Sequence, residues 1–268
     1  MKGIFLSVSL FLLLLITACS IPSPEDTLPP PVAVTTTTPA GTMETSEPAV
    51  TDETVPATTA ALHSTLYLQG VPVEDVICYF NEVVLNAEFV NSGSPAYLQR
   101  WEEPIQYAIY GNPTDEDLDT FSAFLQWLNQ LEGFPGIFEA TDPNQENLSI
   151  YFCSESELID RLGDNFYGTD GGVTFWYTNN KIFQAIICCR TDLDQQLRNS
   201  VILEELYNGL GPVQDTELRS DSIIYSGFTQ PQQLTQIDEL ILKLLYHPLM
   251  QCGMDADACE TVIRQLYY

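Results

Sequence analysis

The segment LEELYNGLGPVQDTELRSDSIIYS, residues 203–226, decides how the rest of the chain is interpreted. It opens in an apolar helical pattern, within which Glu204 and Asn208 are four residues apart. Side chains at that spacing project from one face of a helix. Gly211 then ends the helix and lets the chain turn. Gln214 follows three residues after Gly211, so the chain that returns from the turn can bring its side chain to the same face of the helix as a third polar group. The spacing therefore predicts convergent polar side chains.

This segment resembles the active-site motif of metzincin zinc endopeptidases, H-E-x-x-H-x-x-G-x-x-H-D, and here it reads E-E-L-Y-N-G-L-G-P-V-Q-D. Glu205 stands where those enzymes carry the general-base glutamate, and Gly211 and Asp215 match the glycine and the aspartate. Downstream, residues 222–226 resemble the turn beneath the metal, with Ile224 in place of methionine. The three histidine positions are taken by Glu204, Asn208 and Gln214.

The residues at the histidine positions change the chemistry that the segment can support. Zinc favours imidazole and thiolate ligands, and the only two histidines, His63 and His247, both lie outside the motif. A three-histidine zinc site is therefore impossible. The oxygen ligands that remain suit calcium or magnesium better, and they come from Glu204, Asn208, Gln214 and Asp215. Three interpretations stay open: an internal hydrogen-bond network, a hard-cation site, or a peptidase with Glu205 as general base.

A wider resemblance covers residues 97–254, and the segments that carry it are Arg100-Trp101, Arg190-Thr191-Asp192-Leu193, Val201 to Asp215, Asp221-Ser222-Ile223 and Leu244-Leu245-Tyr246. The chain is similar to domain-of-unknown-function family 2927, a bacterial family of uncharacterised lipoproteins. The resemblance implies an α+β fold of the zincin (metzincin) kind: a mixed twisted sheet with a long helix, an active-site-type helix and a C-terminal helix. It implies no activity.

Hydrophobic periodicity and turn residues predict the order of elements. Gly163 to Gly172, GDNFYGTDGG, is interpreted as a flexible connection because it lacks the spacing of a calcium loop. Helices are expected at 73–89, 115–131, 154–162, 192–209 and 235–246, and strands at 104–110, 137–140, 148–153, 173–177 and 181–189, the last two forming a hairpin.

The N-terminal residues have the pattern of an export signal. Lys2 precedes a short apolar run that ends in Ile-Thr-Ala-Cys at residues 16–19. These four residues resemble the bacterial lipobox, in which the cysteine is lipid-modified and becomes the new N-terminus. The sequence therefore predicts a lipoprotein signal peptide over 1–19, lipidation of Cys19, and a protein anchored to the bacterial cell membrane that faces outside the cytoplasm. Ordinary signal-peptidase cleavage, which discards Cys19, is the alternative.

Residues 20–62 differ in composition from the rest of the chain. They are rich in Pro, Thr and Ala and contain no aromatic residue, so they cannot form a core. We interpret them as a disordered tether that holds a domain away from the lipid surface. Residues 63–268 contain every Trp and Tyr and are expected to form one domain.

The chain is strongly acidic, with a formal net charge of -28. Only six of its 37 acidic residues lie in the tether, so the domain itself is acidic. Such a field repels phosphate groups, which excludes nucleic acid as a partner. The acidity suits solubility, divalent cations or a cationic partner.

An even number of cysteines in an exported domain favours disulfides, since six remain besides Cys19. Cys252 and Cys259 enclose a short loop and are the expected pair. The other candidates for disulfides are Cys78, Cys153, Cys188 and Cys189. Taken together, the sequence favours a cell-envelope lipoprotein with a degenerate zincin-like domain that binds an envelope or extracellular protein, without a cofactor. The alternative is a metal-dependent hydrolase or peptidase.

Overall fold

The computed structural model describes residues 66–85, 97–212, 214–227 and 230–268. The signal peptide, Cys19 and the tether expected from the sequence lie outside these residues. The strands are β1 (Arg100–Trp101), β2 (Ile105–Gly111), β3 (Ile137–Glu139), β4 (Leu148–Cys153), β5 (Gly171–Thr178) and β6 (Lys181–Arg190). The α-helices are α1 (Val73–Leu85), α2 (Asp115–Leu128), α3 (Glu155–Leu162), α4 (Gln195–Asn208), α5 (Gln236–Leu245) and α6 (Ala256–Leu266). Two short 3-10 helices are η2 (Pro143–Gln145) and η3 (Asp164–Phe166).

The strands form one mixed sheet in the order β1-β6-β4-β2-β3, and all of these pairs are parallel. β5 pairs with β6 in the antiparallel direction and completes the sheet. The hairpin between them turns at Asn179 and Asn180, whose φ angles are 50° and 61°. Asparagine tolerates this left-handed conformation, which a tight hairpin turn of this type requires. The hairpin and the mixed α+β sheet expected from the sequence are confirmed.

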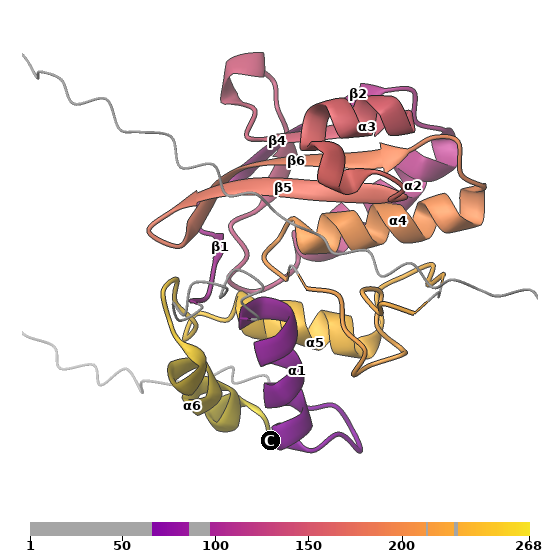
Figure 1. Ribbon diagram of the computed structural model, residues 1–268. Helices are drawn as coiled ribbons and strands as arrows, with labels where there is room; N and C mark the ends of the chain where they lie inside the picture. The colour runs from indigo at the N-terminus through magenta and orange to yellow at the C-terminus, as the bar shows by residue number, and fades with distance from the viewer. Residues whose placement is uncertain (1–65, 86–96, 213, 228–229) are drawn as a thin grey trace, which may run out of the picture. The chain divides into compact units, whose positions relative to one another are not determined.

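Helices cover both faces of the sheet. α2 and α4 lie on one face and α3 on the other, while α1, α5 and α6 lie beyond α4 (Figure 1). The alternation in β4 fits this arrangement, because Leu148, Ile150 and Phe152 are buried in the main core. Cys153 at the end of β4 belongs instead to a small separate cluster beneath α3. No helix among the described residues is long and apolar enough to cross a membrane.

Local capping signals place several helices where the sequence predicts them. Ser154 and Glu157 form a reciprocal capping box at α3, and Thr235 and Asp238 form another at α5. The helix expected at 235–246 is therefore confirmed to within a residue at each end. α6 is an element that the sequence analysis did not predict. Its N-cap is Asp255, whose side chain accepts a hydrogen bond from the amide of Ala258.

The disulfide expected between Cys252 and Cys259 is not formed, and all six cysteines of the described residues carry free thiols. The reason is α6: the second half of the segment interpreted as a closed loop, from Ala256 on, is the start of a helix. Cys259 lies on its buried face, within the core. The Cys252 thiol donates instead to the carbonyl oxygen of Arg100, at 3.8 Å. The disulfides considered for Cys78, Cys153, Cys188 and Cys189 are absent as well.

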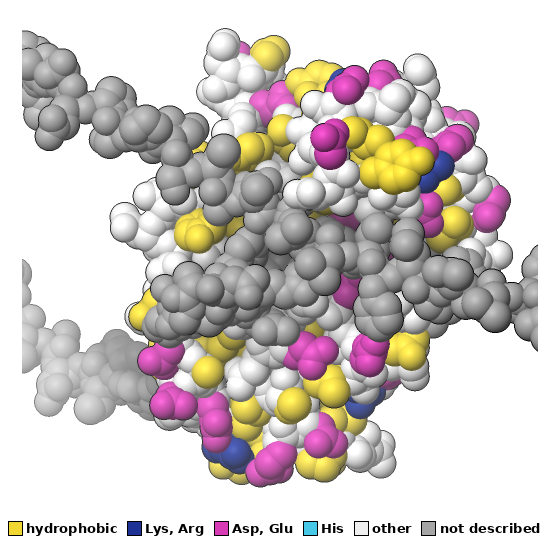
Figure 2. All heavy atoms as spheres, viewed as in Figure 1, with side chains coloured by type: hydrophobic (Ala, Val, Ile, Leu, Met, Phe, Trp, Pro, Cys, Tyr) yellow, Lys and Arg dark blue, Asp and Glu magenta, His cyan; other side chains and the backbone are white. Residues whose placement is uncertain are grey.

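Acidic side chains are spread over the face of the molecule shown in Figure 2, whereas basic ones occur singly. Most of the basic side chains are already engaged by carboxylates. Arg190 pairs with Asp192 at 2.8 Å, and Arg219 pairs with Asp221 at 2.7 Å. The negative charge is thus a property of the folded part of the chain and not only of residues 20–62.

Candidate functional site

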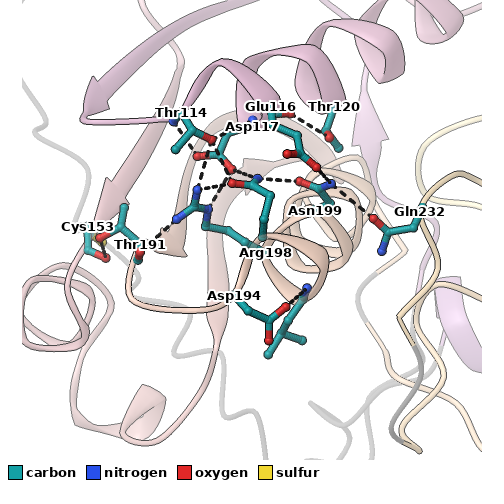
Figure 3. A network of polar contacts seen from close by, with 12 residues as sticks. Thr114, Glu116, Asp117, Thr120, Cys153, Thr191, Asp194, Arg198, Asn199 and Gln232 are labelled. Carbon is teal, nitrogen blue, oxygen red and sulfur yellow. Dashed lines mark hydrogen bonds and ion pairs between the residues drawn. The ribbon is translucent and has the colours of Figure 1, made fainter.

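The N-terminal half of α4 is fixed by a buried ion pair. Nε of Arg198 lies 2.8 Å from Oδ1 of Asp117 on α2, and both side chains are almost fully buried. Gln195 donates to the same carboxylate, while Arg198 also donates to the carbonyl of Thr191 and the hydroxyl of Thr114. Figure 3 shows these contacts converging between the two helices. The network sets the position of α4 against α2 and the sheet.

The C-terminal end of α4 is held by aromatic side chains. Trp101 donates from Nε1 to the carbonyl of Gly209 at 2.9 Å, and the Tyr246 hydroxyl donates to the carbonyl of Leu210 at 2.8 Å. Gly211 follows with a φ of 132°, and a Cβ there would lie 2.7 Å from the carbonyl oxygen of Gln99. α4 itself ends earlier, at Asn208, with Gly209 as its C-cap, and the close approach explains why glycine stands at position 211 in the turn that follows.

The chain then returns beneath α4 in a turn that a buried carboxylate stabilises. Asp238 of α5 accepts hydrogen bonds from the hydroxyl of Ser222 at 2.6 Å and from the amide of Ile223 at 3.2 Å. Tyr79 of α1 donates to Ser222 at 2.7 Å. Since α1 and α5 both hold it, the turn at 222–226 has a defined position below the motif helix.

The polar groups of α4 and this turn face a common cleft of about 300 Å³. Glu204 and Glu205 enter it from α4, and Asp215 enters from the returning chain. Asp170, just before β5, forms another wall. Side chains of the turn complete it, and they are Ile223, Tyr225 and Ser226. Carboxylates from three separate segments thus surround one space.

This crowding of carboxylates favours their protonated forms. Burial, together with the charges of Asp215 and Asp170, raises the pKa of Glu204 to about 8. Burial first, and then the charges of Glu204 and Asp215, raise the pKa of Glu205 well above its usual value. Burial also raises the pKa of Asp170, although Arg190, 3.6 Å away, opposes this. The cleft therefore holds protons at neutral pH that exposed carboxylates would have lost.

One oxygen atom of these carboxyl groups is left without a hydrogen-bond partner. Glu205 is only 6% exposed, and its Oε2 atom contacts no donor or acceptor among the described residues. The same is true of Oδ1 of the buried Asn208. A buried polar atom in this condition costs free energy, commonly about 1–3 kcal/mol. The internal hydrogen-bond network considered from the sequence is therefore not closed at these two side chains.

The residues singled out from the sequence do not all meet in the cleft. Glu204, Glu205 and Asp215 line it, whereas Asn208 and Gln214 are not among the described residues that do so. Asn208 points into the protein, where it is 5% exposed. The returning chain thus brings Asp215, and not Gln214, to the space between α4 and the turn.

Sequence reasoning missed one wall of the site. The segment interpreted as a flexible connection supplies four lining residues, Gly168, Thr169, Asp170 and Gly171. It is tied down by hydrogen bonds from the Gly168 amide to Glu155 and from Arg190 to the carbonyl of Thr169. A Cβ at Gly171 would lie 2.7 Å from Oε1 of Glu205. The glycine-rich composition was therefore the available signal, because it allows β5 to approach the carboxyl of Glu205.

The donors around the cleft do not fit the zinc ion that the motif resemblance suggests. Zinc prefers nitrogen and sulfur ligands in a tight tetrahedral set. The side chains present here offer oxygen only, and no three His, Cys, Asp or Glu side chains among the described residues are close enough to hold one ion. The arrangement presents an acidic, partly unsatisfied surface rather than a compact coordination shell.

One comparison with known proteins confirms the family of unknown function expected from the sequence. Comparison with the curated proteins finds no match. The model of a family described as a protein of unknown function, DUF2927, matches residues 74–265. This span contains the whole sheet, α4 and every wall of the cleft. The chain therefore belongs to the DUF2927 family.

Proposed function

We propose that this chain is an envelope lipoprotein whose domain binds a partner through the acidic cleft and does not cleave it. The observation that carries the proposal is the buried, unpartnered Oε2 of Glu205, in a cleft that Glu204 and Asp215 also line. A carboxyl group that is desolvated without a partner weakens the free domain. A ligand that supplies the missing interaction recovers that free energy.

The proposed fold relationship is that of a zincin that has lost its metal ligands. Three features support it: the motif helix α4, the turn at 222–226 beneath it, and the antiparallel edge strand β5 beside it. Glu205 occupies the general-base position, but burial first, and then the charges of Glu204 and Asp215, raise the pKa of its carboxyl well above the usual value and favour its protonated form. A protonated carboxyl cannot accept a proton from water. The geometry thus favours binding over hydrolysis.

The alternative, a metal-dependent hydrolase with oxygen ligands, is tested by metal content. Full-length protein, purified in detergent without chelators, is expected to contain no stoichiometric metal by inductively coupled plasma mass spectrometry and to cleave no casein. Glu204→Ala and Asn208→Ala variants serve as controls. A stoichiometric metal that disappears in either variant would support the hydrolase and overturn the non-catalytic proposal.

The proposed anchor is tested at Cys19. In a bacterial host fed an alkyne analogue of palmitate, the wild-type chain is expected to carry the label and to sediment with membranes. Cys19→Ala should lose the label and move to the soluble fraction, because a protein without acyl chains loses roughly 0.8 kcal/mol of membrane affinity per buried CH2 group. An unlabelled wild-type chain would contradict lipidation.

A further inference from the structure

We infer that the acidic cleft binds an arginine side chain from a basic segment of a partner protein. This inference rests on the proposed binding function and specifies its ligand. The inference has three requirements. The cleft must favour a cation, and its carboxylates must be placed unsuitably for a single metal ion. The other lining groups must suit a planar cation with several N–H donors.

The need for a cation follows from the unpartnered carboxyl. The Glu205 side chain lines the cleft and its buried Oε2 lacks a hydrogen-bond partner, while Glu204 and Asp215 place further carboxyl oxygens at the same cleft. A donor that also carries positive charge satisfies Oε2 and offsets the repulsion among the carboxylates at the same time. A neutral donor supplies the hydrogen bond to Oε2 but does not offset the repulsion among the carboxylates.

The spacing of the carboxylates favours an organic cation over a metal ion. They come from α4, from the chain before β5 and from the returning chain, and no three acidic side chains among the described residues converge on one point. A metal ion needs its ligands within about 2.0–2.6 Å. A guanidinium group presents five N–H donors in a planar fork and contacts carboxylates that are several ångströms apart.

The remaining walls suit the same group. Tyr225 lines the cleft and is half-buried, so its ring offers a surface on which a guanidinium stacks. The cleft volume of about 300 Å³ is at the lower end of the range for ligand pockets, about 300–1,000 Å³. This is enough for one side chain but not for a large ligand.

The charge of the whole chain indicates a partner that is basic beyond the inserted residue. A net charge of -28 creates a field that attracts cationic segments and accelerates their association. Binding of a cation also favours loss of protons from the cleft, because burial raises the pKa values of Glu204 and Glu205 in the free domain. Asp170, Asp215 and the thiol of Cys189 are the other titratable groups that face these two carboxyls, and Arg190 pairs with Asp170.

The test compares two blocked pentapeptides, Ala-Ala-Arg-Ala-Ala and its citrulline analogue, which keeps the shape of arginine but has no charge. With full-length protein in detergent at low salt, isothermal titration calorimetry is expected to show binding of the arginine peptide at least about tenfold tighter than binding of the citrulline peptide. The affinity should rise between pH 6 and pH 8.5, where arginine itself does not titrate.

Two variants test whether the arginine peptide binds in the cleft. Glu205→Gln keeps the shape of the side chain and should weaken arginine binding by about tenfold or more. Glu103→Gln, an exposed carboxylate on another part of the surface, should leave it unchanged. Calcium chloride and zinc chloride are titrated as separate arms.

Equal affinity for the two peptides, or none for either, would overturn the arginine assignment. Saturable binding of a metal that excludes the arginine peptide would do the same. The proposal of a non-catalytic binding domain fails by a different result, a stoichiometric metal or cleavage of casein. The failures of the two proposals are therefore distinguishable.

Discussion

Replacing Arg198 by methionine is expected to lower the free energy of unfolding by about 3–5 kcal/mol. The substitution leaves Asp117, which is fully buried, without its ionic partner at 2.8 Å. It also removes the donors to Thr191 and Thr114 that connect α4 to its surroundings. Urea unfolding followed by circular dichroism measures the change.

Two further variants show whether the loss comes from the unpaired charge. Adding Asp117→Asn to Arg198→Met should recover part of the stability, because asparagine is neutral and its Oδ1 replaces the carboxylate as acceptor for the Thr114 amide. Arg264→Met breaks an ion pair to Glu74 on the exposed surface and should change little. If Arg198→Met proves no more harmful than Arg264→Met, the network does not hold α4 in place.

Raising the pH from 5 to 8 is expected to destabilise the protein through the carboxyl groups of the cleft. The pKa of Glu204 is raised from 4.5 to about 8, so in this window the folded state binds more protons than the unfolded state. Stability is then fully present below the unfolded pKa and falls as the pH rises towards the folded one. At 1.36 kcal/mol per pKa unit, the loss is on the order of 4 kcal/mol for Glu204 alone.

Urea unfolding at half-unit steps of pH measures this slope. The double variant Glu204→Gln and Glu205→Gln should flatten it, since neither glutamine titrates, and should be more stable than wild type at pH 8. Glu103→Gln should retain the wild-type slope. Contributions from Asp170 and Asp238, whose pKa values are also raised by burial, remain in every variant. A wild-type curve that stays flat between pH 5 and pH 8 would contradict protonation of the cleft.

The sequence predicts most helices and strands because their signals are local. The serine and glutamate at the start of α3 lie three residues apart, and the hairpin turn requires only two asparagines that tolerate positive φ. α6 was missed because two cysteines suggested a closed loop. Its N-cap, Asp255, and its buried Ile263 were present as signals of an amphipathic helix.

The candidate site was predictable only in part. The four-residue spacing of Glu204 and Asn208 indicated one helix face, yet only Glu204 reaches the cleft. One face of a helix contains several residues. The packing of β5 and of the turn at 222–226 against α4 decides which of these residues line the cleft. Gln214 and Asp215 are adjacent, and only the folded path of the returning chain decides that Asp215 lines the cleft.

The sequence by itself determined the α+β class, the order of most elements, the acidic character and the absence of histidines from the motif, because each depends on residue type and local spacing. Only the tertiary structure decided that Asp170 and Gly171 form a wall of the cleft, more than thirty residues before Glu205 in the chain. It alone decided that Oε2 of Glu205 is buried without a partner. Burial and the neighbourhood of charges depend on segments distant in sequence, which a linear pattern does not bring together.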